Sequence, residues 1–221
     1  TANESHRRAK PYCMGTLYWQ FNDCWPVTSW SSLDYYGNWK AFHYQAKRSF
    51  ENLLFSIEEG NDSYRICIVN DDLKQYSGEL VIDLIDFNGT KLWNKKIIFI
   101  ASENSSKIHF EIPKKDFLAY NLKQAVLSVS FPPLEQIYTR HYFFKPKDLQ
   151  ITKPNIQIKI IDEVTIEISS DVLAKDVFLS SENDTFFEDN YFDLLPNEKR
   201  IIKFSKPVQN IKVKSLFDTM K

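Results

Sequence analysis

From residue 53 onward the sequence is a succession of short segments in which apolar and polar residues alternate. The clearest are residues 107–112 and 164–169, where every second residue is apolar. A period of two turns one side of a strand toward a core and the other toward solvent. Several such strands at short, regular spacing favour a β-sandwich.

The pattern predicts two successive sets of strands, separated near residues 145–148. The first set comprises residues 53–57, 64–70, 79–87, 92–100, 106–112, 125–131 and 137–144. The second comprises residues 156–161, 164–169, 174–180, 190–194, 199–204 and 211–216. Asn88-Gly89 predicts a hairpin of type I′, which needs positive φ at both central positions. A short helical turn is expected at residues 114–120.

The first fifty residues follow a different pattern. Residues 1–10 are typical of the end of a helix, which Pro11 then stops. Residues 15–21 predict a buried strand, because they are short, aromatic and apolar on both faces, as in a covered parallel sheet. Polar residues gather at the carboxyl end of this strand, where barrel enzymes carry their chemistry.

A helix is predicted to follow that segment. Trp39, Phe42, Ala46 and Phe50 recur at helical spacing and form an apolar stripe. We expect the helix to begin near residue 37, with Asn38 or Asp34 as its N-cap. His43 lies beside the stripe, where a packed or solvent-facing histidine is expected rather than a catalytic one.

Two stretches resemble a known family. Residues 14–37, MGTLYWQFNDCWPVTSWSSLDYYG, closely resemble the end of the catalytic barrel of β-mannosidases in glycoside hydrolase family 2, and residues 39–44 continue the match. Residues 189–196, DNYFDLLP, resemble the last immunoglobulin-like domain of the same enzymes. The sequence between them matches in pattern only.

The resemblance implies a mainly β chain: two immunoglobulin-like β-sandwich domains preceded by the last strand and helix of a (β/α)8 barrel. The expected domains are residues 1–50 for the end of the barrel, 51–146 for the first sandwich and 147–221 for the C-terminal one. Members of the family are retaining exo-enzymes that remove terminal β-D-mannose from manno-oligosaccharides or glycans.

The catalytic pair of the family is not expected in this chain. Retention needs two carboxyl groups about 5–5.5 Å apart, and in the family both are glutamates on earlier barrel strands. Residues 13–36 hold no glutamate. We therefore expect a C-terminal fragment that is inactive alone. Its partners would be β-mannoside oligosaccharides, for the parent protein, and the missing N-terminal barrel portion.

The resemblance also implies a substrate-binding role for four residues. Trp19 is the first candidate for an aromatic platform under a sugar ring, and Trp25 is the second. Asn22 and Asp23 either hydrogen-bond sugar hydroxyls or brace neighbouring loops, and both alternatives stay open. The bond between Trp19 and Gln20 is expected to be a cis peptide. Without the barrel, residues 14–25 should pack on the first sandwich, pair with another copy or be poorly ordered.

Charge and composition exclude several other partners. A net charge of -1 does not indicate the basic surface that binds nucleic acid, and no apolar run is long enough to span a bilayer. The three cysteines form no disulfide framework, and no cysteine or histidine pair has the spacing of a zinc site. We expect no metal and no cofactor. The sequence leaves the compartment open, with an extracytoplasmic one (periplasmic, secreted or lysosomal) favoured over the cytoplasm.

Three other functions remain open. One is a non-catalytic carbohydrate-binding module that uses Trp19, Trp25 and Trp30. Another is a purely structural pair of immunoglobulin-like modules that support a barrel. The nearest enzymatic alternative is a β-galactosidase or β-glucuronidase of the same family, although the length of the match over residues 19–30 favours a β-mannosidase.

Overall fold

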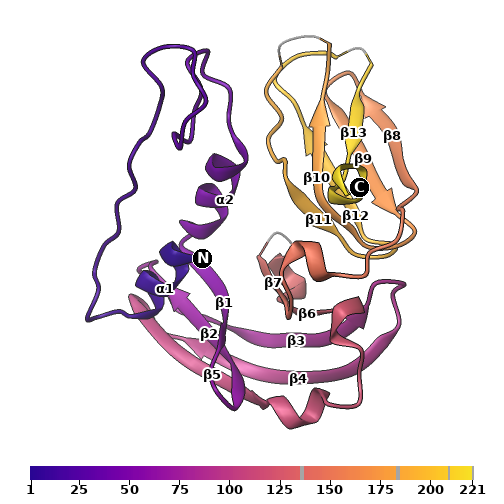
Figure 1. The fold of residues 1–221 in the computed structure, drawn as a ribbon. Helices are drawn as coiled ribbons and strands as arrows, with labels where there is room; N and C mark the ends of the chain where they lie inside the picture. The colour runs from indigo at the N-terminus through magenta and orange to yellow at the C-terminus, as the bar shows by residue number, and fades with distance from the viewer. Residues whose placement is uncertain (135–136, 183–184, 209, 221) are drawn as a thin grey trace. The chain divides into compact units, whose positions relative to one another are not determined.

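The computed structural model describes residues 1–134, 137–182, 185–208 and 210–220. They form two compact units, each of which contains a β-sandwich (Figure 1). The first unit comprises Thr1–Tyr18, Ala46–Asp86 and Lys91–Lys145, and the second comprises Trp19–Gln45, Phe87–Thr90 and the chain from Pro146 onward. The prediction of a mainly β chain with two sandwiches is confirmed. The boundaries at residues 50 and 146 stay predictions.

The sandwich of the first unit consists of two antiparallel sheets. One has the order β1-β2-β5, formed by Leu53–Glu59, Ser63–Asn70 and Ser105–Pro113. The other has the order β4-β3-β6-β7, formed by Lys91–Ala101, Tyr76–Asp86, Ala125–Ser130 and Tyr138–Tyr142. Every strand predicted for this part of the chain is present. Short 3-10 helices lie at Lys114–Phe117, Leu122–Gln124 and Pro132–Leu134.

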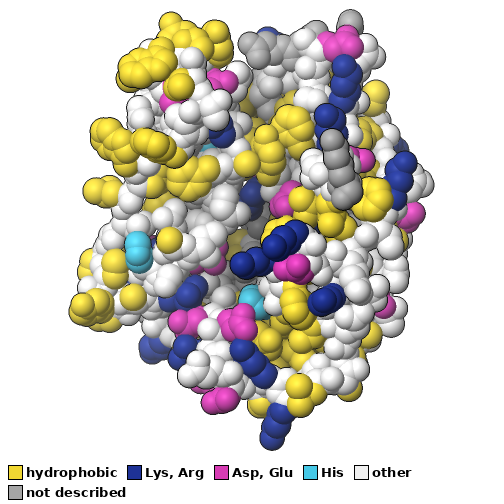
Figure 2. Space-filling model, viewed as in Figure 1, with side chains coloured by type: hydrophobic (Ala, Val, Ile, Leu, Met, Phe, Trp, Pro, Cys, Tyr) yellow, Lys and Arg dark blue, Asp and Glu magenta, His cyan; other side chains and the backbone are white. Residues whose placement is uncertain are grey.

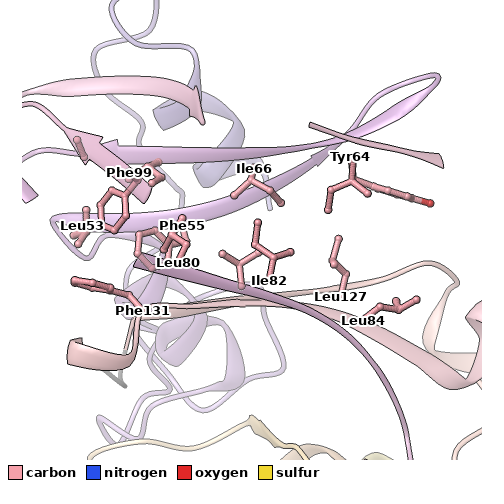
Figure 3. Close-up of a cluster of buried hydrophobic side chains, with 14 of the residues drawn as sticks. Leu53, Phe55, Tyr64, Ile66, Leu80, Ile82, Leu84, Phe99, Leu127 and Phe131 are labelled. Atoms are coloured by element: carbon pink, nitrogen blue, oxygen red, sulfur yellow. The ribbon is translucent and has the colours of Figure 1, made fainter. Parts of the chain in front are cut away.

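The core of this sandwich follows from the period of two. Along β3, Leu80, Ile82 and Leu84 are all 0% exposed. They point toward residues of the opposite sheet such as Phe55 and Ile66, as Figure 3 shows. Burial of each such side chain contributes about 1.5–3 kcal/mol. Burial of this alternating face therefore favours association of the two sheets.

The C-terminal sandwich is smaller. One of its sheets has the order β12-β9-β8, formed by Lys199–Lys203, Thr165–Ser170 and Ile156–Asp162. The other has the order β11-β10-β13, formed by Phe192–Leu194, Ala174–Ser180 and Lys212–Lys214. Further 3-10 helices lie at Pro146–Asp148 and Leu216–Thr219. Ile166, Ile168, Val177, Leu179 and Phe192 lie in its core.

The N-terminal helix α1 (Ala2–Arg8) is attached to the first sandwich by polar bonds. It has no buried residue. Arg7 and Lys10 contact the two carboxylate oxygens of Asp71 at 2.9 and 2.6 Å, and Arg8 donates to the Ser56 hydroxyl at 2.6 Å. Burial pushes the pKa of Asp71 upward, but Lys10 and Arg7 hold it below its ordinary value. The helix therefore depends on the sandwich to which it is bonded.

The prediction of a buried strand at residues 15–21 is wrong for this chain. These residues form no strand, and Leu17 and Trp19 are 98% and 81% exposed. A strand needs at least one neighbouring strand to receive its backbone hydrogen bonds, and no strand of the described residues lies beside this segment.

Residues 14–18 belong to the unit of the first sandwich and residues 19–25 to that of the C-terminal one. The expected packing on the first sandwich, pairing with another copy or poor order of residues 14–25 stays a prediction. The cis peptide between Trp19 and Gln20 is confirmed.

Two further local predictions need correction. Helix α2 (Ala41–Ser49) begins later than expected, because one oxygen of Asp34 accepts from the backbone N–H groups of Tyr36 and Asn38 and closes a turn before it. In the hairpin between β3 and β4, Gly89 has a φ of 99° while Asn88 is not among the residues of positive φ, so the turn is not type I′.

The buried face of α2 also differs from the predicted stripe. Of the predicted stripe, Ala46 is buried at 5% exposed, but Phe42 and Phe50 are 37% and 44% exposed. Tyr44, which lies outside the predicted stripe, is only 4% exposed. No helix of the described residues is long and apolar enough to cross a bilayer.

Candidate functional site

The four candidate residues lie on one loop, residues 19–34, which we call the aromatic loop. Its two ends are joined by backbone hydrogen bonds. The Ser32 N–H donates to the carbonyls of Gln20 and Phe21 at 3.1 Å each, and the Leu33 N–H donates to Phe21 at 2.9 Å. The Asp23 N–H in turn donates to the Leu33 carbonyl at 3.3 Å. These bonds fix residues 20–23 against residues 32–33.

Asp23 is the polar centre of the loop and is only 4% exposed. Ser29 donates to one carboxylate oxygen at 2.5 Å, and the Lys40 ammonium contacts the other at 2.9 Å. Lys40 also donates to the Ser31 hydroxyl at 2.7 Å. The bonds from Ser29 and Lys40 hold the pKa of Asp23 below its ordinary value, so the carboxylate is charged at neutral pH. Its geometry is that of a brace between the loop and the start of α2.

A second brace joins α2 to the loop through His43. The Ser32 hydroxyl donates to the Phe21 carbonyl at 2.8 Å, and Nδ1 of His43 lies 2.9 Å from the same hydroxyl. Since the single hydroxyl proton is used toward Phe21, Nδ1 of His43 is the donor. Burial lowers the pKa of His43, which favours the neutral ring. The prediction of a packed histidine is consistent with this contact.

The aromatic side chains of the loop are open to solvent. Trp19, Trp25 and Trp30 are 81%, 65% and 70% exposed, and Phe21 is 56% exposed. Figure 2 shows hydrophobic side chains gathered over this part of the chain, at the upper left. Exposed apolar side chains gathered in this way are typical of surfaces that contact a ligand or partner.

Asn22 is exposed, and its amide nitrogen donates to the Asp23 carbonyl at 3.2 Å. The structure therefore brings Asn22 and Asp23 together and leaves both tryptophans, Trp19 and Trp25, accessible on the same loop. A contact between any of these four residues and a sugar stays a prediction.

Sequence reasoning missed Lys40, which it placed simply off the apolar stripe of the helix. A signal for it exists: a carboxylate inside an aromatic stretch needs a counter-charge, and Lys40 is the first cationic residue after Asp23. Ser29 and Ser32 carried no comparable signal. No group of three or more His, Cys, Asp or Glu side chains that could hold a metal occurs in the described part of the chain.

Two family models match the chain. Residues 62–148 match a mannosidase Ig/CBM-like domain, and residues 151–219 match the Ig-fold domain of mannosidases. The first segment covers strands β2 to β7 of the first sandwich and leaves out β1, and the second covers all strands of the C-terminal sandwich.

The relatives that the chain matches are much longer than the chain itself. It is 26% identical to a β-mannosidase of Mus musculus over 94% of this chain and 25% of the mouse protein. It is 49% identical to a β-mannosidase of Capra hircus over 53% of this chain and 14% of the goat protein. The chain thus spans about a quarter or less of these relatives.

Solved structures also match nearly all of this chain over only part of their own length. The crystal structure of a β-D-mannosidase from Dictyoglomus thermophilum superposes with a TM-score of 0.85 at 29% identity, over 96% of this chain and 27% of that chain. An exo-chitosanase from Amycolatopsis orientalis superposes with a TM-score of 0.71 at 13% identity, over 96% of this chain and 32% of that chain. The second likeness shows the fold alone.

Proposed function

We propose that this chain, which carries the two immunoglobulin-like domains of β-mannosidases, is the C-terminal part of a retaining exo-β-mannosidase. The whole protein would hydrolyse terminal β-D-mannose from manno-oligosaccharides or glycans. Support comes from relatives that match nearly all of this chain over only a quarter of their own length. The remainder of such a protein would contain the barrel and its two catalytic glutamates.

The observation that carries the proposal is the exposed Trp19 on a braced loop. In the whole protein the aromatic loop would form part of the floor of the active site, where an indole face stacks against the apolar face of a pyranose. Trp19 is the first candidate for this contact and Trp25 the second. Asn22 could hydrogen-bond a sugar hydroxyl, while buried Asp23 and its partner Lys40 keep the loop in place.

The first test uses the chain as it is. The purified protein is incubated with a chromogenic β-mannoside, and release of the chromophore is followed. We expect no turnover, because retention requires a nucleophile and an acid/base that this chain does not supply. Measurable turnover would refute the fragment assignment.

The second test uses the longer protein, obtained by adding the coding sequence upstream of Thr1. Trp19→Ala should lower kcat/KM for a β-mannoside by at least about tenfold, which corresponds to roughly 1.4 kcal/mol of transition-state stabilisation. Phe144→Ala removes a 41% exposed ring of the first sandwich and serves as the matched control, with kcat/KM expected to stay unchanged. Equal effects of both substitutions would contradict the assigned role of Trp19. A higher kcat/KM for a β-galactoside or β-glucuronide would favour that specificity instead.

A second candidate function is non-catalytic carbohydrate binding, which the exposure of Trp19, Trp25 and Trp30 favours. It predicts saturable binding of manno-oligosaccharide to this chain by calorimetry, lost in Trp19→Ala. A purely structural role predicts no binding. For the chain alone we favour the structural role, because a floor without the rest of its site encloses no ligand.

A further inference from the structure

We infer that the C-terminal sandwich positions the aromatic loop, through three aromatic residues that contact the start of α2. We call Phe186, Phe187 and Tyr191 the aromatic seat. The sandwich would then act on the sugar site from a distance, as a positioning element. The inference rests on the proposed function in one respect only, which is that the ligand of the aromatic loop is a sugar.

Within the aromatic seat, Tyr191 directly follows Asn190, whose side chain bonds to the backbone of β10. Asn190, 4% exposed, accepts from the Leu179 N–H at 2.8 Å and donates to the Leu179 carbonyl at 2.9 Å. Val177 is paired with Phe192, so Leu179 lies opposite Asn190, where the side-chain amide replaces a strand backbone. Tyr191 follows with a φ of 53°, outside the strand geometry.

Tyr191 then makes two ring contacts. Its ring centroid lies 5.0 Å from that of Phe178, with an interplanar angle of 31°, and 5.9 Å from that of Tyr44 on α2. Phe178 belongs to β10, so the ring of Tyr191 is supported from the sheet itself. Ring pairs in this range contribute about 0.5–1.5 kcal/mol beyond their burial.

The start of α2 contacts the rest of the aromatic seat. The Tyr44 hydroxyl donates to the Phe187 carbonyl at 3.0 Å. Trp39 packs edge-on against Phe186, with ring centroids 4.7 Å apart, and also contacts His43 at 4.2 Å. These contacts fix both the position and the rotation of the first turn of the helix.

From that turn the braces lead directly into the aromatic loop. Lys40 contacts Asp23, and its own N–H donates to the Ser32 carbonyl at 3.0 Å. His43 contacts the Ser32 hydroxyl, as described above. A continuous series of contacts therefore runs from β10 to Asp23. Because Trp19, Trp25 and Trp30 are exposed, the loop has no apolar core of its own to fix its conformation.

Amide hydrogen exchange of this chain tests the inference. The reporters are the Asp23, Ser32 and Leu33 amides, whose hydrogen bonds close the aromatic loop. In Tyr191→Ala their exchange should accelerate at least about tenfold, which corresponds to roughly 1.4 kcal/mol. Amides of β9 should change far less. Tyr191→Phe, which keeps the ring and its contacts with Phe178 and Tyr44, should accelerate exchange less than Tyr191→Ala does.

A second variant covers the case in which Tyr191→Ala does not fold. Tyr44→Phe removes only the hydroxyl that donates to Phe187 and should accelerate the same reporter amides by a smaller factor. Tyr36→Phe is the matched control, since Tyr36 is 72% exposed on the neighbouring turn, and it should leave them unchanged.

Two results would overturn the inference: reporter amides that stay unchanged in both variants, or acceleration of β9 amides by the same factor as the loop. The second result would mean that Tyr191 only stabilises the sandwich. These measurements contain no sugar, so a failure of the proposed function would leave them unaffected.

Discussion

The substitution Asn190→Ala gives the sharpest test of how the C-terminal sandwich is held together. The side-chain amide of Asn190 satisfies both the N–H and the C=O of Leu179, a residue that is 1% exposed. Its removal leaves one buried donor and one buried acceptor unpaired, each at a cost of about 1–3 kcal/mol, or about 2–6 kcal/mol together. We expect the unfolding free energy of this unit to fall by that amount.

Hydrogen exchange of the β9 and β10 amides measures this change in the unit concerned. A loss of about 2 kcal/mol accelerates exchange through unfolding by about 30-fold, while amides of β2 and β3 should keep their rates. The matched control is Asn155→Ala, at an exposed position, where we expect less than about 0.5 kcal/mol, or about a twofold change. If the two alanine variants exchange at the same rate, the side-chain amide does not replace a strand.

Asn190→Asp adds a pH dependence to the same test. A carboxylate cannot donate to the Leu179 carbonyl, so the folded sandwich favours the protonated acid and raises its pKa above the unfolded value. A raised pKa gives stability that is present below the unfolded pKa and lost as the pH rises through the folded pKa. The urea midpoint of this variant should therefore fall with rising pH over that window, relative to the unmodified chain.

Three further predictions concern other parts of the chain. Because the pKa of Asp23 is lowered in the fold, its contribution to stability is present above the unfolded pKa and is lost as the pH falls through the folded pKa. Tryptophan fluorescence should report loosening of the aromatic loop in acid, and Asp23→Asn should remove that transition. Phe99→Ala should lower the unfolding free energy of the first sandwich by about 3–5 kcal/mol in urea denaturation, against a small effect for Ile98→Ala, whose side chain is 75% exposed. Gly78→Ala would place a Cβ 2.6 Å from a ring carbon of Phe131, and we expect a loss of about 1–3 kcal/mol in the same assay; a neutral result would show that the ring moves freely.

The strands could be predicted because their signal is local. Leu80, Ile82 and Leu84 alternate along β3 in the sequence and are all fully buried in the fold. The aromatic loop could not be predicted in the same way, because residues 15–21 have the composition of a buried strand but the burial depends on partner strands. The composition of a segment indicates whether it favours a strand, but a strand forms only where neighbouring strands and packing are available.

The braces of the site depend on pairs that are distant in sequence. Lys40 and Asp23 are 17 residues apart, and Tyr44 and Phe187 are 143 apart. No periodicity connects such pairs. The predicted strand at residues 190–194 begins in the structure at Phe192, because Asn190 contributes its side chain where a backbone was expected.

The attachment of α1 has a consequence for how the protein is made. A helix of seven residues without a buried face is not stable in water by itself. The Arg8 carbonyl accepts from the Ser106 hydroxyl, 98 residues later in the chain. At a synthesis rate of about 5–20 residues per second, roughly 5–20 s pass between the emergence of these two residues from the ribosome. During that interval the Arg8 carbonyl lacks the Ser106 hydroxyl that donates to it in the folded chain.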